Sequence, residues 1–366
     1  MAFIIDAHQD LAYNALSFQR DYRRSAVEIR KSETGTSTPS LTGDTLLGWP
    51  DFQRGQIALI FSTLFIAPRR YAGGAWETQV FDDAVSARRL YQAQLEYYHR
   101  LTEQNPDKFR LVRTQNDLKS IMRAWQTQPA AYPEVTHPVG LVLLMEGGEG
   151  LGNPRELEDW WKIGLRIFGP VWAGTRWCGG MHEKGGFTAE GRELLDVMAS
   201  LGYTLDLAHM TEESALEALD RYEGTIIASH ANSRSLIHGA YGERHLTDET
   251  IRRLIERDGV MGVLPYNRFL VPEWKNSDPR EWVTLEHLIA HIDHICQLAG
   301  DARHAALGTD FDGGFGWPAV PFEINSIADL QKLEDQLLKH GYQQDEVQSI
   351  FSGNWQHILE RGLPAS

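Results

Sequence analysis

The sequence predicts a single (β/α)8 barrel domain over residues 1–366, with extra helices at the C-terminus. Short apolar runs that are typical of buried strands alternate with helical stretches, which indicates a parallel sheet built from right-handed βαβ units. About eight strands follow in one series, and no Pro-, Ser- or Gly-rich linker divides the later half of the chain, which favours a closed barrel. The alternative, a doubly wound nucleotide-binding sheet, lacks support because no GxGxxG or GxxxxGK[ST] motif follows a strand.

The first half of the chain is less regular than the second. Its first strand is the apolar run Phe3–Ile5, and an extended surface loop is expected at about 17–45, where Gly, Ser, Thr and Pro interrupt a polar segment. Three further strands are predicted at Gln56–Ala67, Phe109–Val112 and Gly140–Met145. Between them lie the helices predicted at Asp82–Gln104 and Asp117–Trp125.

From about residue 155 the alternation of helix and strand becomes regular. The predicted strands of this half are Leu165–Val171, Tyr203–His209, Thr225–His230, Val260–Tyr266 and Ala305–Asp310. The predicted helices are 155–163, 188–201, 212–222, 248–257 and 285–298, and the C-terminal helices begin at about 327. This half therefore supplies most of the barrel.

Composition limits the partners and the compartment. The formal net charge of −15 opposes binding to nucleic acid or to an anionic membrane, because both would repel the protein. Two cysteines, Cys178 and Cys296, cannot form a disulfide framework, which suits a reducing compartment. The N-terminus lacks a secretory signal pattern and no apolar run reaches the length of a membrane span, so we expect a cytoplasmic protein. A homodimer is compatible with the sequence.

Metal-ligand residue types stand where the apolar runs end. In an extended segment side chains alternate, so His8 and Asp10 point to the same side after the first strand. Taken alone, this pair is better explained by a local hydrogen bond. The residues at the strand ends are His8, Asp10, Glu146, His209, His230 and Asp310. The C-terminal ends of barrel strands open on one face, so these three histidines and three carboxylates are predicted to converge and to hold two divalent ions.

The segments around these residues resemble the membrane dipeptidase (renal dipeptidase) family, a branch of the amidohydrolase-type barrels. The matching segments are DAHQD at 6–10, MEGG at 145–148, DLAHM at 206–210, ASH at 228–230 and GTDFDGG at 308–314. Weaker similarity lies in DFQRGQ before the second strand, PYN at 265–267 and SGNW at 352–355. The resemblance spans nearly the whole chain in the same order.

The resemblance implies a binuclear zinc site. By matching position, His8 and Asp10 would bind one ion, His209 and His230 the other, and Glu146 would bridge the two. Glu149 competes with Glu146 for the bridging role, but Glu146 follows the strand directly and is preferred.

The resemblance also implies the residues that act on the substrate. Asp310 would be the catalytic acid and base. Arg244 would grip the substrate carboxylate, since a guanidinium meets a carboxylate bidentately, although Arg234 is near enough for the alignment to slip. Tyr266 is expected to line the pocket.

One position departs from the family. Where the family often carries a histidine that polarises the scissile carbonyl, the stretch RIFGPVWAGTRW places Trp172. An indole can donate one hydrogen bond but carries no positive charge. His182 in the GGMHEKGG loop is an alternative donor, although a solvated loop residue is the simpler interpretation. The spaced histidines His287, His291 and His294 imitate a metal motif, but we expect them in the outer helical layer without a metal.

Three functions follow from these residues. The preferred one is a zinc dipeptidase that uses a metal-bridging hydroxide to hydrolyse dipeptides, including those with a D-residue at the C-terminal position. The second is a binuclear metal hydrolase of another small amide, lactam or lactone, which Trp172 motivates. The third is a non-catalytic metal-dependent binding protein, which would have no need of Asp310.

Overall fold

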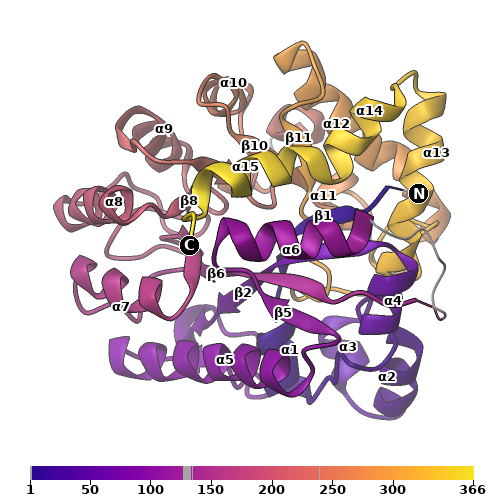
Figure 1. The fold of residues 1–366 in the computed structure, drawn as a ribbon, viewed down its shortest axis with the longest axis horizontal. Helices are drawn as coiled ribbons and strands as arrows, with labels where there is room; N and C mark the ends of the chain where they lie inside the picture. Colours follow the sequence, from indigo (N-terminus) through magenta and orange to yellow (C-terminus); the bar gives the residue numbers. More distant parts are fainter. Residues whose placement is uncertain (1, 127–132, 134, 239) are drawn as a thin grey trace.

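A closed barrel of parallel strands surrounded by helices forms the centre of the protein (Figure 1). The computed structural model describes residues 2–126, 133, 135–238 and 240–366. Strands follow the order β2-β1-β11-β10-β9-β8-β7-β6, and β6 pairs with β2 to close the ring. These strands are β1 (Ile4–Gln9), β2 (Ile57–Phe65), β6 (Val139–Glu146), β7 (Leu165–Gly169), β8 (Thr204–Asp206), β9 (Ile226–Ala228), β10 (Val260–Val263) and β11 (Ala305–Leu307). The predicted (β/α)8 barrel is confirmed.

The contact between β2 and β6 closes the ring. The two strands pair in continuous register from Leu59 opposite Gly140 to Phe65 opposite Glu146. Nearly every residue in both strands is buried, because side chains fill the interior of the barrel and helices cover the outside. This burial explains why their sequences are almost continuously apolar.

Helices alternate with the strands and cover the barrel. They are α5 (Ala84–Gln104), α6 (Gln115–Gln126), α7 (Leu157–Lys162), α8 (Ala189–Leu201), α9 (Glu212–Arg221), α10 (Asp248–Glu256) and α12 (Leu285–Ala299). Three of them begin after a threonine whose side chain accepts a hydrogen bond from a backbone N–H of the first turn, namely Thr188, Thr211 and Thr247. Such caps satisfy a donor that the helix leaves unpaired, and so they determine where each helix begins.

The predicted strand at 109–112 forms but lies outside the ring. It is β5 (Phe109–Leu111), which pairs with the beginning of β6 from Val139 to Leu141. From Leu143 onward, β6 pairs with β7 instead of β5. β5 is therefore a ninth strand of the sheet at the N-terminal end of β6 and takes no part in closure.

The segment at 17–45, which the sequence predicts as an extended loop, contains two helices, α2 (Ala26–Glu33) and α3 (Thr38–Thr42). A capping box between Ser25 and Glu28 starts α2 and overrides the polar composition. The segment predicted as an extended loop therefore contains two short helices.

Asp312 fastens this segment to the loop that follows β11. Its fully buried carboxylate accepts hydrogen bonds from the Tyr22 hydroxyl at 2.9 Å, the Leu46 N–H at 2.8 Å and the Thr45 hydroxyl. Its Oδ2 also lies 3.1 Å from Nη1 of the buried Arg20. A buried charge of this kind is stable only while all of these partners remain.

Shorter elements complete the fold. They are α1 (Leu11–Phe18), α4 (Trp49–Arg54), β3 (Ala67–Pro68), β4 (Val80–Phe81) and α11 (Asn267–Leu270). The predicted C-terminal helices are present as α13 (Lys332–Lys339), α14 (Gln344–Gln348), a π-helical turn (Ser349–Gly353) and α15 (Asn354–Gly362). From α15 the Trp355 indole donates to the Leu307 carbonyl at 2.9 Å, which ties the end of the chain to β11.

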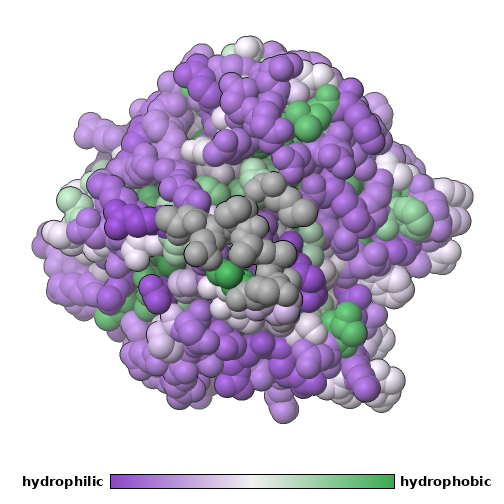
Figure 2. Space-filling view, turned by 45° about the vertical axis from the view of Figure 1, so that its right-hand side comes forward, coloured by the Kyte–Doolittle hydropathy of each residue, from purple (hydrophilic) through white to green (hydrophobic). Residues whose placement is uncertain are grey.

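Hydrophilic residues predominate on the face shown in Figure 2, and hydrophobic ones are scattered among them. Among the helices that the structure describes, none has the length and apolarity needed to cross a membrane.

We predict that Asp312→Ala lowers the free energy of unfolding by about 3–5 kcal/mol. The substitution leaves the buried Tyr22 hydroxyl and Leu46 N–H without this acceptor, and it removes one of the two carboxylates that pair with Arg20. Chemical denaturation measures the change. The control is Asp21→Ala, which removes the partner of the exposed Arg23 from the same segment and should cost less than about 1 kcal/mol. Equal losses in the two variants would contradict the fastening role of Asp312.

Candidate metal centre

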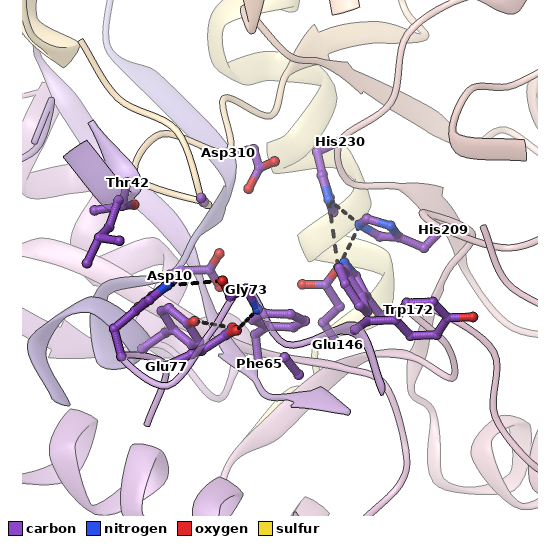
Figure 3. A pocket seen from close by; sticks show the side chains of 17 residues that line it. Asp10, Thr42, Phe65, Gly73, Glu77, Glu146, Trp172, His209, His230 and Asp310 are labelled. Atoms are coloured by element: carbon purple, nitrogen blue, oxygen red, sulfur yellow. Dashed lines mark hydrogen bonds and ion pairs between the residues drawn. The ribbon is translucent and has the colours of Figure 1, made fainter. Parts of the chain in front are cut away.

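The six predicted ligand residues lie together at the C-terminal rim of the barrel. Figure 3 shows those that line the cavity, namely Asp10, Glu146, His209, His230 and Asp310. Each follows the C-terminal end of a barrel strand or lies in its last residues, so the parallel arrangement brings them to one place. Their ligand atoms form three overlapping groups within which all atoms lie within 4.8 Å of one another. The groups are His8–Asp10–Glu146, Glu146–His209–His230 and His8–His230–Asp310.

Glu146 stands between the two halves of this cluster. Its Oε1 lies 2.7 Å from Nε2 of His209 and 4.0 Å from Nε2 of His230, while its Oε2 lies 3.5 Å from Nε2 of His8. In Figure 3 the side chains of Glu146, His209 and His230 point toward one another. A carboxylate with one oxygen toward each half has the arrangement that a bridging ligand requires.

The cluster fits divalent cations better than it fits hydrogen bonds among its own members. Both ring nitrogens of His8 and Oδ1 of Asp10 are buried without a hydrogen-bond partner. The Nε2 atoms of His209 and His230 face each other at 2.9 Å, although a pair of neutral imidazoles can share only one proton there. Buried unpaired polar atoms are costly, and a cation bound to these lone pairs would remove that cost.

Burial and neighbouring charges shift the pKa values of the clustered histidines in different directions. Burial lowers the pKa of His209 to about 4, and the Arg244 guanidinium acts in the same direction. Burial likewise lowers the pKa of His230. Both rings are thus kept neutral, which is the form that binds a metal. Burial also opposes the charge on His8, but the surrounding carboxylates, Glu146 foremost, raise its pKa to about 10. The surplus of negative charge around His8 therefore favours a cation.

Hydrogen bonds behind the cluster orient His230. The Ser229 hydroxyl donates to the buried Asp206, and it lies 2.8 Å from Nδ1 of His230. Because the hydroxyl proton is used on Asp206, Nδ1 of His230 is the donor and its Nε2 keeps a lone pair for a metal. The sequence prediction included the DLAHM and ASH segments but missed this supporting role of Asp206 and Ser229.

The backbone at two of the six residues is in the left-handed region. His209 has φ 67° and Asp310 has φ 54°, values that few non-glycine residues adopt and that concentrate at functional sites. Gly313 packs so closely under Asp310 that an added Cβ would lie 1.9 Å from the carboxylate oxygen Oδ1. The GTDFDGG segment therefore needs glycine at this position to hold Asp310 in place.

A cavity of about 270 Å³ opens above the cluster. Asp10, Glu146, His209, His230 and Asp310 line its floor. Aromatic side chains line its wall, and they include Tyr13, Phe65, Tyr71, Trp76 and Trp172. A small cavity that combines apolar walls with a cluster of polar groups is the usual form of a substrate site.

The model of the membrane dipeptidase family, peptidase family M19, matches residues 1–362. The chain belongs to the membrane dipeptidase family. It is accordingly a metal-dependent hydrolase of the peptidase class. The resemblance that the sequence indicates is confirmed.

Individual relatives of the membrane dipeptidase family are distant. An uncharacterised protein from the pqqA 5' region of Klebsiella pneumoniae is 28% identical over 61% of this chain and 82% of that protein. An uncharacterised dipeptidase of Schizosaccharomyces pombe is 30% identical, and the match covers 57% of this chain but only 51% of that protein. A metallopeptidase from Rhodobacter sphaeroides, crystallised with a phosphinate mimic of the dipeptide L-Ala-D-Ala, has a TM-score of 0.76 at 22% identity over 99% of each chain.

Trp172 occupies the cavity at the position where the family resemblance predicts histidine. It lies just beyond the end of β7, lines the cavity wall, and its ring centroid is 6.3 Å from that of His209. Its role in substrate binding stays a prediction.

Arg244 and Tyr266 lie beside the cavity without being among its lining residues. The buried Arg244 donates from Nη1 to the His230 carbonyl at 2.9 Å, and its Nη2 has no hydrogen-bond partner. Tyr266 stacks on Phe315 with ring centroids 4.3 Å apart. Both predicted contacts with substrate remain predictions.

Glu149 and Arg234, the alternatives to Glu146 and Arg244, contact other residues. Glu149 accepts a hydrogen bond from the Tyr91 hydroxyl at 3.0 Å and belongs to none of the three metal-ligand groups. Arg234 lies 3.4 Å from each of Glu212 and Glu243. The geometry therefore favours Glu146 and Arg244.

The remaining histidines have other neighbours. His182 is exposed and stacks on Tyr71 at 4.6 Å between ring centroids. On α12, His287 takes part in the N-terminal capping box, and His294 bonds to Asp248. His291 lies on the same outer helix, where it is buried and accepts the Ser233 N–H at 3.1 Å. None of these histidines belongs to the metal-ligand groups found among the described residues.

We predict that His209→Ala lowers the metal content of the purified protein, because it removes one of the nitrogen ligands facing Glu146. Inductively coupled plasma mass spectrometry measures the content. His357→Ala, which removes an exposed histidine bonded to Asp258, is the matched control and should leave the content as in wild type. Retention of all bound metal in His209→Ala would remove His209 from the site.

Proposed function

We propose that the chain is a binuclear zinc dipeptidase that hydrolyses dipeptides, including those with a D-residue at the C-terminal position. The observation that carries the proposal is Glu146, whose two carboxylate oxygens face His8 on one side and His209 on the other. Membership of the membrane dipeptidase family supports a peptide substrate. The ligand of the Rhodobacter relative, a mimic of L-Ala-D-Ala, supports the stereochemistry.

The donor set suits zinc. Imidazole nitrogens and carboxylate oxygens are the ligands that zinc takes in catalytic sites. His8 and Asp10 would hold one ion, His209 and His230 the other, and Glu146 both. When bound, the two cations would supply a nucleophilic hydroxide near neutral pH and polarise the scissile carbonyl.

The chain's own residues would bind the substrate and move the proton. Oδ1 of Asp310 lies 3.7 Å from Nε2 of His8, so this carboxylate borders the cluster and lines the cavity. From there it would take the proton of the attacking water and pass it to the nitrogen of the leaving amine. Arg244 would bind the terminal carboxylate of the substrate through its unpaired Nη2, and Tyr266 would close the pocket on that side.

The size of the cavity supports a small substrate. A volume of about 270 Å³ is at the lower end of ligand pockets and leaves little room for a longer peptide. The aromatic wall excludes water from one side of the scissile bond, which strengthens the electrostatic interactions of the buried carboxylates.

We predict that purified protein binds about two zinc ions and cleaves some members of a panel of dipeptides with L- or D-residues at the C-terminus. Asp310→Asn should lower kcat by about 10²–10⁴-fold, the usual contribution of a general acid and base, while a dipeptide still binds. A zinc-replete protein that cleaves no member of the panel would contradict the dipeptidase proposal.

A second candidate function rests on Trp172. At this position Trp172 could offer the carbonyl oxygen an indole N–H but no positive charge. A bond that is more reactive than a peptide would need less stabilisation of that oxygen. The alternative is therefore a binuclear hydrolase of another small amide, lactam or lactone.

Comparison of peptide, lactam and ester turnover in wild type and Trp172→His separates the two functions. If the chain is a dipeptidase, wild type has a higher kcat/KM for peptides than for lactams or esters. Trp172→His should then leave that order of preference unchanged. If lactams or esters are the better wild-type substrates and the substitution shifts preference toward peptides, the second function is correct.

A further inference from the structure

The cavity contains a carboxylate that the proposed dipeptidase mechanism does not use. Glu77 lines the same cavity as the metal cluster but belongs to none of the three ligand groups. Its Oε1 accepts the Tyr13 hydroxyl at 2.5 Å and its Oε2 accepts the Gly73 N–H at 2.6 Å. These bonds hold the carboxylate in one orientation without neutralising it.

The Arg69 guanidinium acts electrostatically on Glu77, but its own ion pair is with Asp82 at 3.0 Å. Among the described residues Glu77 forms no ion pair with a lysine, arginine or histidine, and neither lysine nor arginine lines the cavity. Asp10, Glu146 and Asp310 have the metal ions as counter-charges in the proposed function. Glu77 is thus the carboxylate of the cavity lining that has neither a proposed metal ion nor, among the described residues, an ion-pair partner.

A continuous aromatic wall connects Glu77 to the metal cluster. Tyr13, whose hydroxyl binds Glu77, packs on Phe65 with ring centroids 5.5 Å apart. Phe65 packs on Trp172 at 5.3 Å, and Trp172 lies 6.3 Å from the ring of His209. Glu77 therefore stands at the end of the wall that is far from His209 (Figure 3). Aromatic faces that lead to a carboxylate are the surroundings in which proteins bind organic cations.

We propose that this wall and Glu77 form a subsite for a cationic side chain, lysine or arginine, on the N-terminal residue of the dipeptide. The proposal rests on the proposed dipeptidase function. The methylene stem would lie along Phe65 and Tyr13, and the ammonium or guanidinium would meet the Glu77 carboxylate. Glu77 lies at Tyr13, at the opposite end of the wall from Trp172 and His209, and this position favours a side-chain cation over the α-ammonium group.

The test compares two dipeptides that differ only at the tip of the N-terminal side chain, Lys-Ala and norleucine-Ala, on the zinc-loaded protein. Wild type should prefer Lys-Ala by at least about tenfold in kcat/KM, since hydrogen bonds to charged groups discriminate by this amount or more. In Glu77→Gln the ratio of the two kcat/KM values should fall close to one. Glu77→Asp, which keeps the charge, should retain a larger ratio than Glu77→Gln.

Glu190→Gln provides the matched control, because it neutralises an exposed carboxylate outside the cavity. Its ratio should equal that of wild type, which excludes an effect of net charge. Equal kcat/KM values for Lys-Ala and norleucine-Ala in wild type would overturn the subsite, whether or not the variants fold. An equal loss for both substrates in Glu77→Gln would also overturn it and would point to the α-ammonium group.

The outcome for the subsite is separable from that for the dipeptidase function. Cleavage of norleucine-Ala as fast as Lys-Ala would overturn the cationic subsite alone. Cleavage of neither these two nor any other dipeptide by the zinc-replete protein would overturn the dipeptidase function itself.

Discussion

Closure of the barrel through the β2–β6 pairing is the constraint on which the candidate site depends. The continuous register of these strands ends with Phe65 opposite Glu146, so the same contact that closes the ring fixes Glu146 at its rim. Phe65, at the end of the partner strand, begins the aromatic wall of the cavity. The other ligands follow strands that are held in the same ring, and their convergence is a consequence of closure.

Burial of many polar groups at one rim is energetically unfavourable. Hydrogen bonds and ion pairs from the surrounding structure offset part of this unfavourable free energy. Behind the site, Asp206 and Ser229 orient His230 through hydrogen bonds. Beside it, the buried Asp312 fastens the segment at 17–45 to the loop that carries Asp310. The ligand atoms themselves remain incompletely paired, which is the expected state of a protein whose site is completed by cations.

Much of this could be predicted from the sequence because barrel strands and their ligands leave a local signal. An apolar run that stops at histidine or a carboxylate is visible at His8, Glu146 and Asp310. Strand register leaves no such signal, so β5 could not be recognised as lying outside the ring. Glu77 was missed for a similar reason: it stands in a short irregular segment, and only the contact with Tyr13, far away in the sequence, brings it into the cavity.

The central proposal is that Glu146 would bridge two metal ions, and anomalous diffraction from crystals of the zinc-loaded protein tests it most directly. Data collected on both sides of the zinc absorption edge should give two peaks flanking the Glu146 carboxylate. One peak should contact His8 and Asp10, and the other should contact His209 and His230. A single peak, or zinc located away from these residues in protein that hydrolyses dipeptides, would contradict the account.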